Sequence, residues 1–414
     1  MVLESIIPKK FSSNARFFLF AIFLNGIGNG IFEVISQLYF ISLGFDGEAI
    51  GSLIMMNPVG ALLMYTPAGI LADRYGRKKM MVGGFILTTI GIILFLSSKD
   101  LAILRLSFLI VGLGNAMFVV LTPLYASFFE KEDLDKAFGL NVSINIIAFS
   151  IGNLFGFVPS LLINKIGFSI QFAYWILLLT GVFILLIQTP FYMFSIYGLT
   201  ETERKSSFKF ELESLWVTMR FTLIAFLGNI AIGVFFTLFP YYANRKFGIE
   251  SDALGSLFFA SRLISAISSM LAPKISLRIG TAETIIIMLS LAAPFYLMIP
   301  LAQSWTILSI FYMARVYFSS INEPLITSLF VRNLKEDEKT TANSLRLMGI
   351  QGGSILAPWI SGQLMMHGSL DLPAYMGTAL YIILACSSYP LLRRFMNNNS
   401  TNNDFADCVL NELL

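Results

Sequence analysis

The stretch GILADRYGRKKMM, residues 69–81, places five charged side chains within the seven positions from Asp73 to Lys79. The chain is almost wholly apolar on both sides, with GSLIMMNPVGALLMYTPA before this stretch and VGGFILTTIGIILFL after it. Charged residues make up only 13% of the sequence, whereas a soluble protein carries about 25%. A short charged segment between two long apolar runs predicts a loop that joins two membrane spans.

The rest of the 414-residue chain is built in the same way, because it is 56% hydrophobic with a mean hydropathy of +0.75. About 20 helical residues cross a hydrocarbon core of about 30 Å. Runs of that length predict twelve spans, at approximately 16–44, 48–73, 80–98, 101–129, 137–164, 170–197, 215–244, 251–277, 283–302, 304–331, 340–366 and 374–392. No run alternates with the period of two that a membrane β-strand needs. We therefore predict an all-α membrane protein with twelve transmembrane helices.

Lysine and arginine predict the orientation of the helices, because the cytoplasmic loops of membrane proteins are enriched in both. With the N-terminus inside, 21 of the 28 fall on the inner side, five fall outside, and Arg262 and Arg315 lie within spans. We expect both termini to face the cytoplasm and the protein to lie in the plasma membrane. The net charge of +3 then reflects topology and gives no indication of nucleic-acid binding.

The sequence repeats itself at an offset of about 204 residues. LGFDGEAIGSLIMM (43–56) is echoed by FGIESDALGSLFFA (247–260), and GILADRYG (69–76) aligns with PKISLRIG (273–280), which lacks the acid. The repeat predicts two pseudo-symmetric halves of six helices, parallel to one another. The predicted segments are an N-terminus (1–15), an N-terminal half (16–197), a linker (198–214), a C-terminal half (215–394) and a tail (395–414).

The sequence contains no phosphate-binding Gly-Lys-Ser/Thr loop, no metal-ligand cluster and no nucleophile elbow. We therefore expect no enzymatic activity, no cofactor and no bound metal. The two cysteines, Cys386 and Cys408, imply no disulfide framework.

The pattern Gly69-x-x-x-Asp73-Arg74-x-Gly76-Arg77-Lys78-Lys79, between the second and third of twelve helices, resembles the signature loop of the major facilitator superfamily. In topology, repeat and linker the resemblance covers about residues 16–394. It implies a secondary transporter that works by alternating access, with a substrate site near the midplane between the halves.

The resemblance also makes the loop a conformational latch, formed by Gly69, Asp73, Arg74, Gly76, Arg77 and Glu130. It implies that Asp73 faces the N-terminus of the eleventh helix near residues 340–343, where the helix dipole favours an anion. It further implies that Arg77 pairs with Glu130, while Gly76 permits a tight turn. The alternative interpretation is a topological anchor, for which the cations suffice and no acid is needed.

Two signatures of the family's drug–proton antiporters are incomplete in this chain. Phe108 occupies the position of an intramembrane arginine in the fourth helix, four residues before Gly112, and Arg105 lies one turn further out. In the fifth helix the antiporter pattern survives as Gly152-x-x-x-Gly156 without its proline. The two glycines are equally compatible with plain close packing of helices.

The first helix carries a polar stripe, because Asn25, Asn29, Glu33 and Gln37 recur at every fourth position and so share one face. Glu33 lies eleven residues from Gly44 at the outer end, a depth of about 17 Å at 1.5 Å per residue. An ionisable group at this depth costs several kcal/mol and predicts a functional role.

Arg262 and Arg315 each lie eleven residues from the outer start of their spans, so we expect all three ionisable groups to line one central cavity. A structural ion pair between Glu33 and one arginine is the alternative; it leaves the other arginine uncompensated unless Glu323 neutralises Arg315. The predicted substrate-binding residues are Asn29, Glu33, Asn115, Asn229, Arg262, Tyr312 and Arg315, and the predicted proton-coupling residues are Glu33 and then Glu323.

Three hypotheses about function follow. The first is proton-coupled transport of a small organic solute, with a slight preference for efflux. The second is uptake or exchange of a small organic anion bound by Arg262 and Arg315. The third is a non-transporting membrane receptor on the same fold. In each case we expect a small molecule, protons or another ion, and the lipid bilayer as partners of a monomer.

Overall fold

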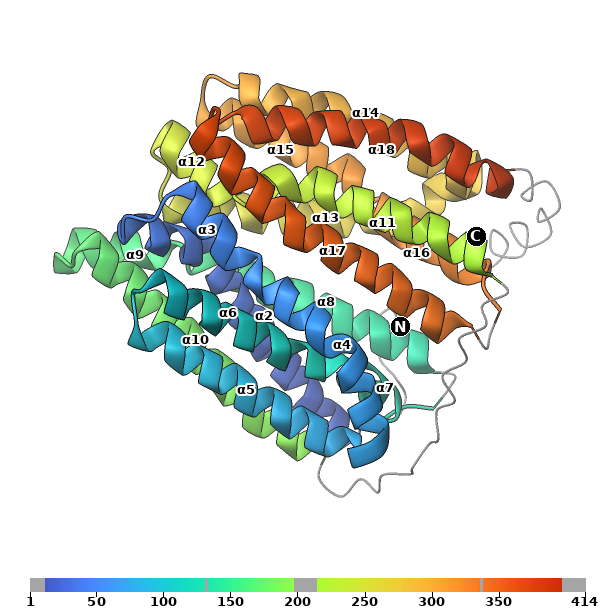
Figure 1. Ribbon diagram of the computed structural model, residues 1–414, viewed down its shortest axis with the longest axis horizontal. Coiled ribbons are helices and arrows are strands. Elements are labelled where there is room, and N and C mark those ends of the chain that lie inside the picture. Colours follow the sequence, from blue (N-terminus) through green and yellow to red (C-terminus); the bar gives the residue numbers. More distant parts are fainter. Residues whose placement is uncertain (1–11, 131–132, 197–213, 336–337, 397–414) are drawn as a thin grey trace, which may run out of the picture. The chain divides into compact units, whose positions relative to one another are not determined.

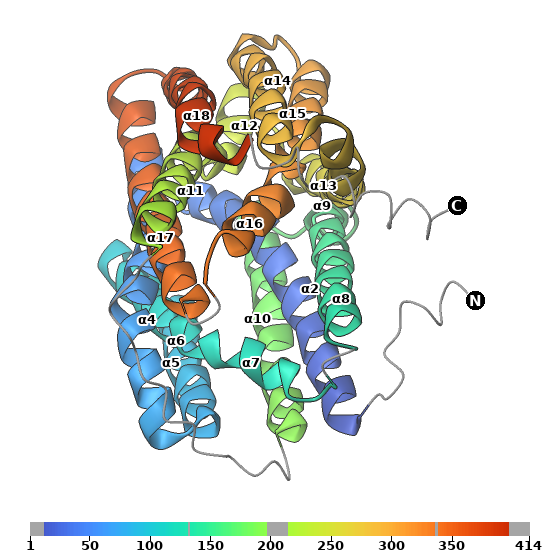
Figure 2. The ribbon, with the colours of Figure 1, turned by 90° about the vertical axis from the view of Figure 1, so that its right-hand side faces the viewer.

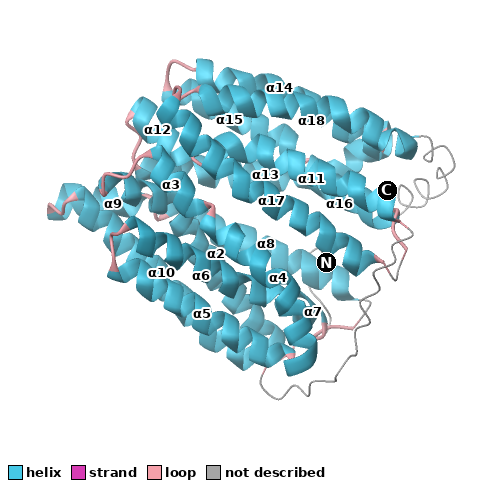
Figure 3. Ribbon diagram, in the orientation of Figure 1, coloured by secondary structure: helices cyan, strands magenta, loops and turns pink. Residues whose placement is uncertain are grey.

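The computed structural model describes residues 12–130, 133–196, 214–335 and 338–396. The described residues form helices joined by short loops, and no strand is found among them (Figure 3). The chain divides into two compact units, the first made of residues 1–207 and 238–259 and the second of residues 208–237 and 260–414. The predicted linker, tail and N-terminal segment lie for the most part outside the described residues.

The first six predicted spans correspond to the elements coloured blue to light green in Figure 1. These elements are α2 (Ser13–Ser42), α3 (Gly47–Ile54), α4 (Met56–Tyr75), α5 (Arg77–Ser97), α6 (Leu101–Met117), the 3₁₀ turn η1 (Phe118–Val120), α7 (Leu121–Ala126), α8 (Leu134–Leu154), α9 (Phe157–Leu161), the π turn η3 (Leu162–Ile166) and α10 (Ile170–Ser195).

The last six spans correspond to the elements coloured yellow-green to red in Figure 1. They are α11 (Leu215–Phe236), α12 (Phe239–Phe247), α13 (Ser251–Ile279), α14 (Thr281–Leu301), α15 (Trp305–Ser320), α16 (Asn322–Arg332), α17 (Lys339–His367) and α18 (Leu372–Met396).

Ten segments of the described chain are long and apolar enough to cross a membrane. The other two predicted spans, 304–331 and 340–366, are helical as well: α15 and α16 form the first and α17 forms the second. The first is interrupted between Ser320 and Asn322, so neither piece alone is of spanning length, and α17 begins with the polar sequence KTTANSLR. The twelve-helix arrangement predicted from the sequence is therefore confirmed.

The two halves repeat the same packing pattern. In the first unit α2 packs against both α8 and α10, and in the second unit α11 packs against both α17 and α18 (Figure 2). The first helix of each half therefore lies between the fifth and sixth helices of that half.

Two pairs of glycines, each separated by 204 residues, mark the repeat in the backbone. Gly44 and Gly248 have φ angles of 88° and 66°, and Gly76 and Gly280 have φ angles of 89° and 102°. Residues with a side chain are strained at such angles, which is why glycine recurs at both turns.

The glycines of α2 are used for close packing of helices. A Cβ atom on Gly26 would lie 2.6 Å from the Cβ of Ala148 on α8, and one on Gly30 would collide with the carbonyl oxygen of Phe149. A Cβ atom on Gly28 would lie 2.6 Å from the side chain of Leu185 on α10. Because lipid supplies no hydrophobic drive between helices, such close van der Waals contact is what holds them together.

Residues 238–259 complete the first unit, although they follow the linker in sequence. The helix breaks between α11 and α12, and the backbone N–H of Tyr241 donates to Oε1 of Gln37 on α2 at 3.3 Å. A Cβ atom on Gly255 would collide with the carbonyl oxygen of Asn153 on α8. The start of α13 therefore lies directly against the end of α8.

Candidate functional site

The charged stretch forms the end of α4 and the start of α5. α4 ends at Tyr75, Gly76 turns the chain with a φ of 89° and a ψ of 150°, and α5 begins at Arg77. Arg74 is exposed, and its guanidinium carbon lies 5.4 Å from the ring centroid of Tyr75. The glycine turn expected from the sequence is present.

The latch contacts themselves stay predictions. The side chains of Asp73 and Arg77 lie outside the described part of the structure, although both residues are helical, as is Gly69. Glu130 is exposed just after α7.

The polar stripe on α2 changes in character along the helix. Asn29 is exposed, and its side-chain amide donates to the carbonyl oxygen of Asn25 at 2.9 Å and to its Oδ1 at 3.1 Å. Glu33 is half-buried one turn later, and Gln37 is buried and accepts the hydrogen bond from Tyr241. Gln37 thus has a structural role, whereas Asn29 and Glu33 remain partly accessible.

Arg315 on α15 is buried, with 6% of its surface exposed. Its guanidinium carbon lies 4.3 Å from the ring centroid of Phe236, 5.8 Å from that of Tyr296 and 5.9 Å from that of Tyr381. We call these four residues the arginine cluster; they come from α15, α11, α14 and α18 of the second unit.

The arginine cluster has unsatisfied polar atoms. Within the described residues, Nε and Nη2 of Arg315 are buried and make no hydrogen bond, and the same holds for the hydroxyl of Tyr381. The hydroxyl of Tyr296 donates to the carbonyl oxygen of Ala231 at 2.9 Å. Arg315 is therefore held by ring faces alone, with three polar atoms left over in the cluster.

Glu323 does not neutralise Arg315, contrary to the expectation from sequence. Its Oε1 lies 3.2 Å from Nη2 of Arg346 on α17, and Arg346 also donates to the hydroxyl of Thr327 at 3.3 Å. The reason is the break between α15 and α16, because Glu323 lies in the first turn of the new helix, α16, and not on the continuous helix assumed from the sequence.

The remaining predicted residues are spread over several helices. Tyr312 is half-buried on α15 beside the arginine cluster, with its ring 5.4 Å from that of Phe236. Asn229 lies where α11 crosses α17 and accepts a hydrogen bond from Ser354 at 3.3 Å. Asn115 is exposed on α6, and Arg262 is half-buried on α13.

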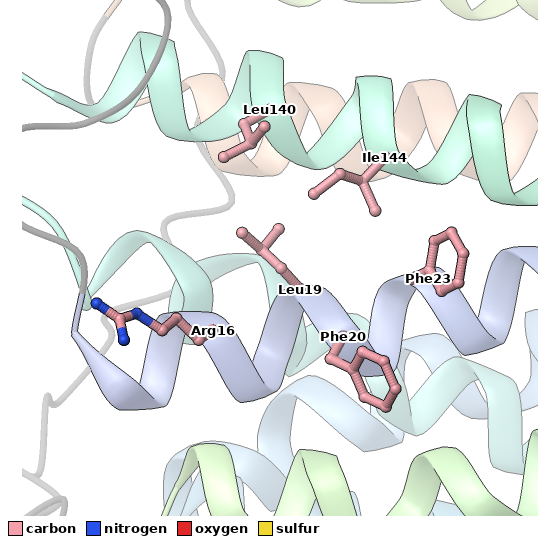
Figure 4. A pocket seen from close by; sticks show the side chains of 6 residues that line it. All are labelled: Arg16, Leu19, Phe20, Phe23, Leu140 and Ile144. Carbon is pink, nitrogen blue, oxygen red and sulfur yellow. The ribbon is translucent and has the colours of Figure 1, made fainter. Parts of the chain in front are cut away.

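The first unit has an open groove of about 390 Å³ between α2 and α8, away from all of the predicted site residues. Figure 4 shows Leu140 and Ile144 pointing from α8 toward Leu19 on α2. The other lining residues are Arg16, Phe20 and Phe23, so the groove is apolar with one cation at its end.

Comparison with known proteins identifies the family. The model of the "Major Facilitator Superfamily" matches residues 18–220 and again residues 221–404, which together include almost the whole chain. The chain belongs to the major facilitator superfamily. It is therefore a multi-pass integral membrane protein and a secondary transporter of a small molecule, and it is not an enzyme.

This facilitator is similar in sequence to two bacterial resistance proteins. It is 24% identical to "Quinolone resistance protein NorA" of Staphylococcus aureus over 86% of this chain and 91% of the relative. It is 20% identical to "Multidrug resistance protein 1" of Bacillus subtilis over 87% and 92%.

Solved structures show the same fold. A bacterial homologue of the human lysosomal transporter Spinster covers 94% of this facilitator with a TM-score of 0.74 and 14% identity, and 99% of that chain is matched. A bacterial homologue of the iron transporter ferroportin covers 92% with a TM-score of 0.75 and 12% identity, and 99% of that chain is matched.

Sequence reasoning missed three members of the arginine cluster, namely Phe236, Tyr296 and Tyr381. A signal was present in the repeat. Arg315 lies eleven residues after Ser304, which caps α15, and the residue eleven positions after Asp100, which caps α6, is Val111. A charge in one half where the other half has valine marks a position that the fold itself does not require.

Proposed function

We propose that this facilitator exports small organic solutes across the plasma membrane in exchange for protons. The observation that carries the proposal is its similarity, over most of its length, to two proteins named for resistance to quinolones and to multiple drugs. The positive-inside distribution supports an orientation with both termini in the cytoplasm, and the chain acts as a monomer.

Glu33 is the protonation site in this proposal. It is half-buried in a membrane-spanning helix, next to the accessible Asn29 on the same face. A carboxyl group is tolerated in such surroundings when protonated, and its charged form needs a nearby cation or water. Substrate and proton then compete for one site, which is sufficient for exchange. The loop at 69–81 acts as the latch that couples this site to the change between inward-open and outward-open states.

The test uses purified protein in liposomes with an imposed pH gradient and a fluorescent organic dye as substrate. Glu33→Gln resembles the protonated form, so it should still exchange dye across the membrane while losing accumulation driven by the gradient. Asn25→Asp is the control for added charge, because it places an acid two turns away on the same helix face. The double variant Asn25→Asp, Glu33→Gln should not regain accumulation of the dye. Retained accumulation in Glu33→Gln would exclude Glu33 from coupling and make Glu323 the next candidate.

A second function is favoured by the arginine cluster: uptake or exchange of a small organic anion, bound by Arg315 with Arg262. A buried cation without a paired carboxylate suits an anionic ligand. The same liposomes separate the two functions. An exporter accumulates its substrate on the side from which protons leave, whereas an anion–proton symporter accumulates it on the side that protons enter.

A further inference from the structure

The starting observation is that the guanidinium of Arg315 is buried among aromatic rings. Arg315 is 6% exposed, and among the described residues no carboxylate pairs with it, since Glu323 is bonded to Arg346. A buried charge without a partner destabilises the folded protein. The π-face of Phe236, whose centroid lies 4.3 Å from the guanidinium carbon, offsets part of this cost. The remaining hydrogen-bonding capacity of Arg315 is suited to an anionic group.

The unsatisfied nitrogen atoms of Arg315 share one edge of its guanidinium group. Nε and Nη2 lie on one edge of the guanidinium plane and point in nearly the same direction, and both lack an acceptor among the described residues. This edge is a fork that a carboxylate fills with two parallel hydrogen bonds. The buried hydroxyl of Tyr381 also lacks a partner, and its ring lies 5.9 Å from the same guanidinium. It can donate a third hydrogen bond to one carboxylate oxygen.

The surroundings of the fork define the rest of the ligand. The rings of Phe236 and Tyr296 are 4.9 Å apart, and Tyr312 lies 5.4 Å from Phe236. Aromatic faces such as these bind a planar or apolar body by stacking. Phe236 is also the last residue of α11, where the helix ends at the break before α12, so the chain can move there without disrupting a continuous helix.

We propose that the arginine cluster binds the carboxylate of an amphipathic organic monoacid, with its two oxygens on Nε and Nη2 of Arg315 and a third hydrogen bond from Tyr381. This inference rests on the proposed function, in that the ligand is the transported small molecule. It places the carboxylate within the second unit, on Arg315 and Tyr381. When the ligand binds, the guanidinium of Arg315 pairs with a carboxylate and no longer contacts aromatic rings alone.

The test measures binding by the purified full-length protein in nanodiscs, using 2-naphthoate as the probe. Its amide, 2-naphthamide, has the same shape without the charge. Wild-type protein should bind naphthoate at least tenfold more tightly than naphthamide, and Arg315→Gln should remove this preference. Tyr381→Phe should weaken naphthoate binding severalfold. Arg105→Gln is the matched control, because that arginine bonds Ser52 in the first unit, and this variant should bind as wild type does.

Three results would overturn the proposal. They are equal binding of acid and amide, unchanged naphthoate binding in Arg315→Gln, and full displacement of naphthoate by millimolar chloride, which would identify a site for inorganic anions.

Thermal unfolding without ligand gives an independent readout. Arg315→Met should raise the unfolding midpoint if the cation is retained for binding, and a lowered midpoint would make Arg315 structural. Binding is measured without a pH gradient, whereas proton coupling is measured as accumulation driven by the gradient in liposomes. Failure of proton coupling and failure of this site are thereby distinguished.

Discussion

The fourth helix of each half, α6 in the first and α15 in the second, has different surroundings: a phenylalanine cluster in the first half and the arginine cluster in the second. Phe40, Phe95 and Phe108 contact one another with ring centroids 6.0–6.3 Å apart. At an offset of 204 residues, Phe108 corresponds to Tyr312 and Val111 to Arg315. The fourth helix of the first half therefore has two apolar side chains at the positions where the fourth helix of the second half has Tyr312 and the buried cation of Arg315.

The difference separates what the fold needs from what has been added to it. The first half shows that these helices pack well with phenylalanine and valine, so the fold has no need of an arginine there. The second half retains a buried charge that destabilises the folded protein. Such a residue is retained for a ligand or for a conformational change.

The most severe test of this comparison transfers the charge to the first half. Val111→Arg should lower the free energy of unfolding by about 3 kcal/mol, because a longer, charged side chain must fit where a Cβ atom on Gly91 would already lie 2.6 Å from Val111. Thermal unfolding in detergent measures the change, with Val111→Met as the control for size. A Val111→Arg protein as stable as wild type would show that either half accommodates a midplane cation.

The loops that join the second and third helices also differ between the two halves. The first contains Asp73 before its glycine turn, whereas the matching loop has Ser276 and Leu277 before Arg278. Asp73→Asn should reduce turnover by about 100-fold, near the upper limit for conformational coupling, with little change in insertion or in substrate affinity. Initial rates in liposomes are the measurement. The control is Glu283→Gln, beside the matching turn, which should leave the rate within about twofold of wild type. Normal turnover in Asp73→Asn would mean that the first loop is only a topological anchor.

The glycine turns are the feature that the halves share, so they should respond alike. Gly76→Ala and Gly280→Ala should each lower the free energy of unfolding by about 2 kcal/mol, because φ angles of 89° and 102° strain any residue with a Cβ atom. Gly139→Ala on α8, where a Cβ atom would meet open space, is the control and should be neutral or stabilising. A loss of stability at one turn but not at the other would show that the two turns contribute unequally to the free energy of unfolding.

The smallest effect is expected at Arg105, which lies on α6 one turn before Phe108 of the phenylalanine cluster. Its Nη2 donates to the hydroxyl of Ser52 at 2.7 Å, in a partly buried position. Arg105→Ala should cost about 1 kcal/mol of stability and leave transport almost unchanged, whereas Arg262→Ala and Arg315→Ala should abolish substrate binding. Radiolabelled substrate uptake compares the three. If Arg105 proved the most sensitive, it would have replaced the antiporter arginine that Phe108 displaces.

The fold was predictable because hydropathy, cation distribution and the repeat all follow from the bilayer as solvent. Apolar runs of spanning length, the glycine turn at Gly76 and the repeat at offset 204 are local or periodic signals. The position of Glu323 was not predictable, because a continuous helix through 304–331 was assumed, and the break before Asn322 redirects its carboxylate to Arg346.

The arginine cluster was only partly predictable for a related reason. Arg315 was identified because a charge in an apolar span is conspicuous, but Tyr296 and Tyr381 look like any other tyrosine of a membrane helix. Their relation to Arg315 comes from three helices far apart in sequence, which periodicity does not report.

The composition of the first unit has a consequence for how the protein is made. Residues 238–259 belong to that unit, where Gly255 lies against Asn153 and the N–H of Tyr241 bonds Gln37. When the ribosome has released the sixth helix, the first half is still missing these contacts, and it must wait for the chain to be extended through Phe259. At about 5–20 residues per second this delay lasts several seconds. During that time Gln37 and Asn153 lack these partners, so the order of synthesis makes the first unit depend on the second half of the chain for its completion.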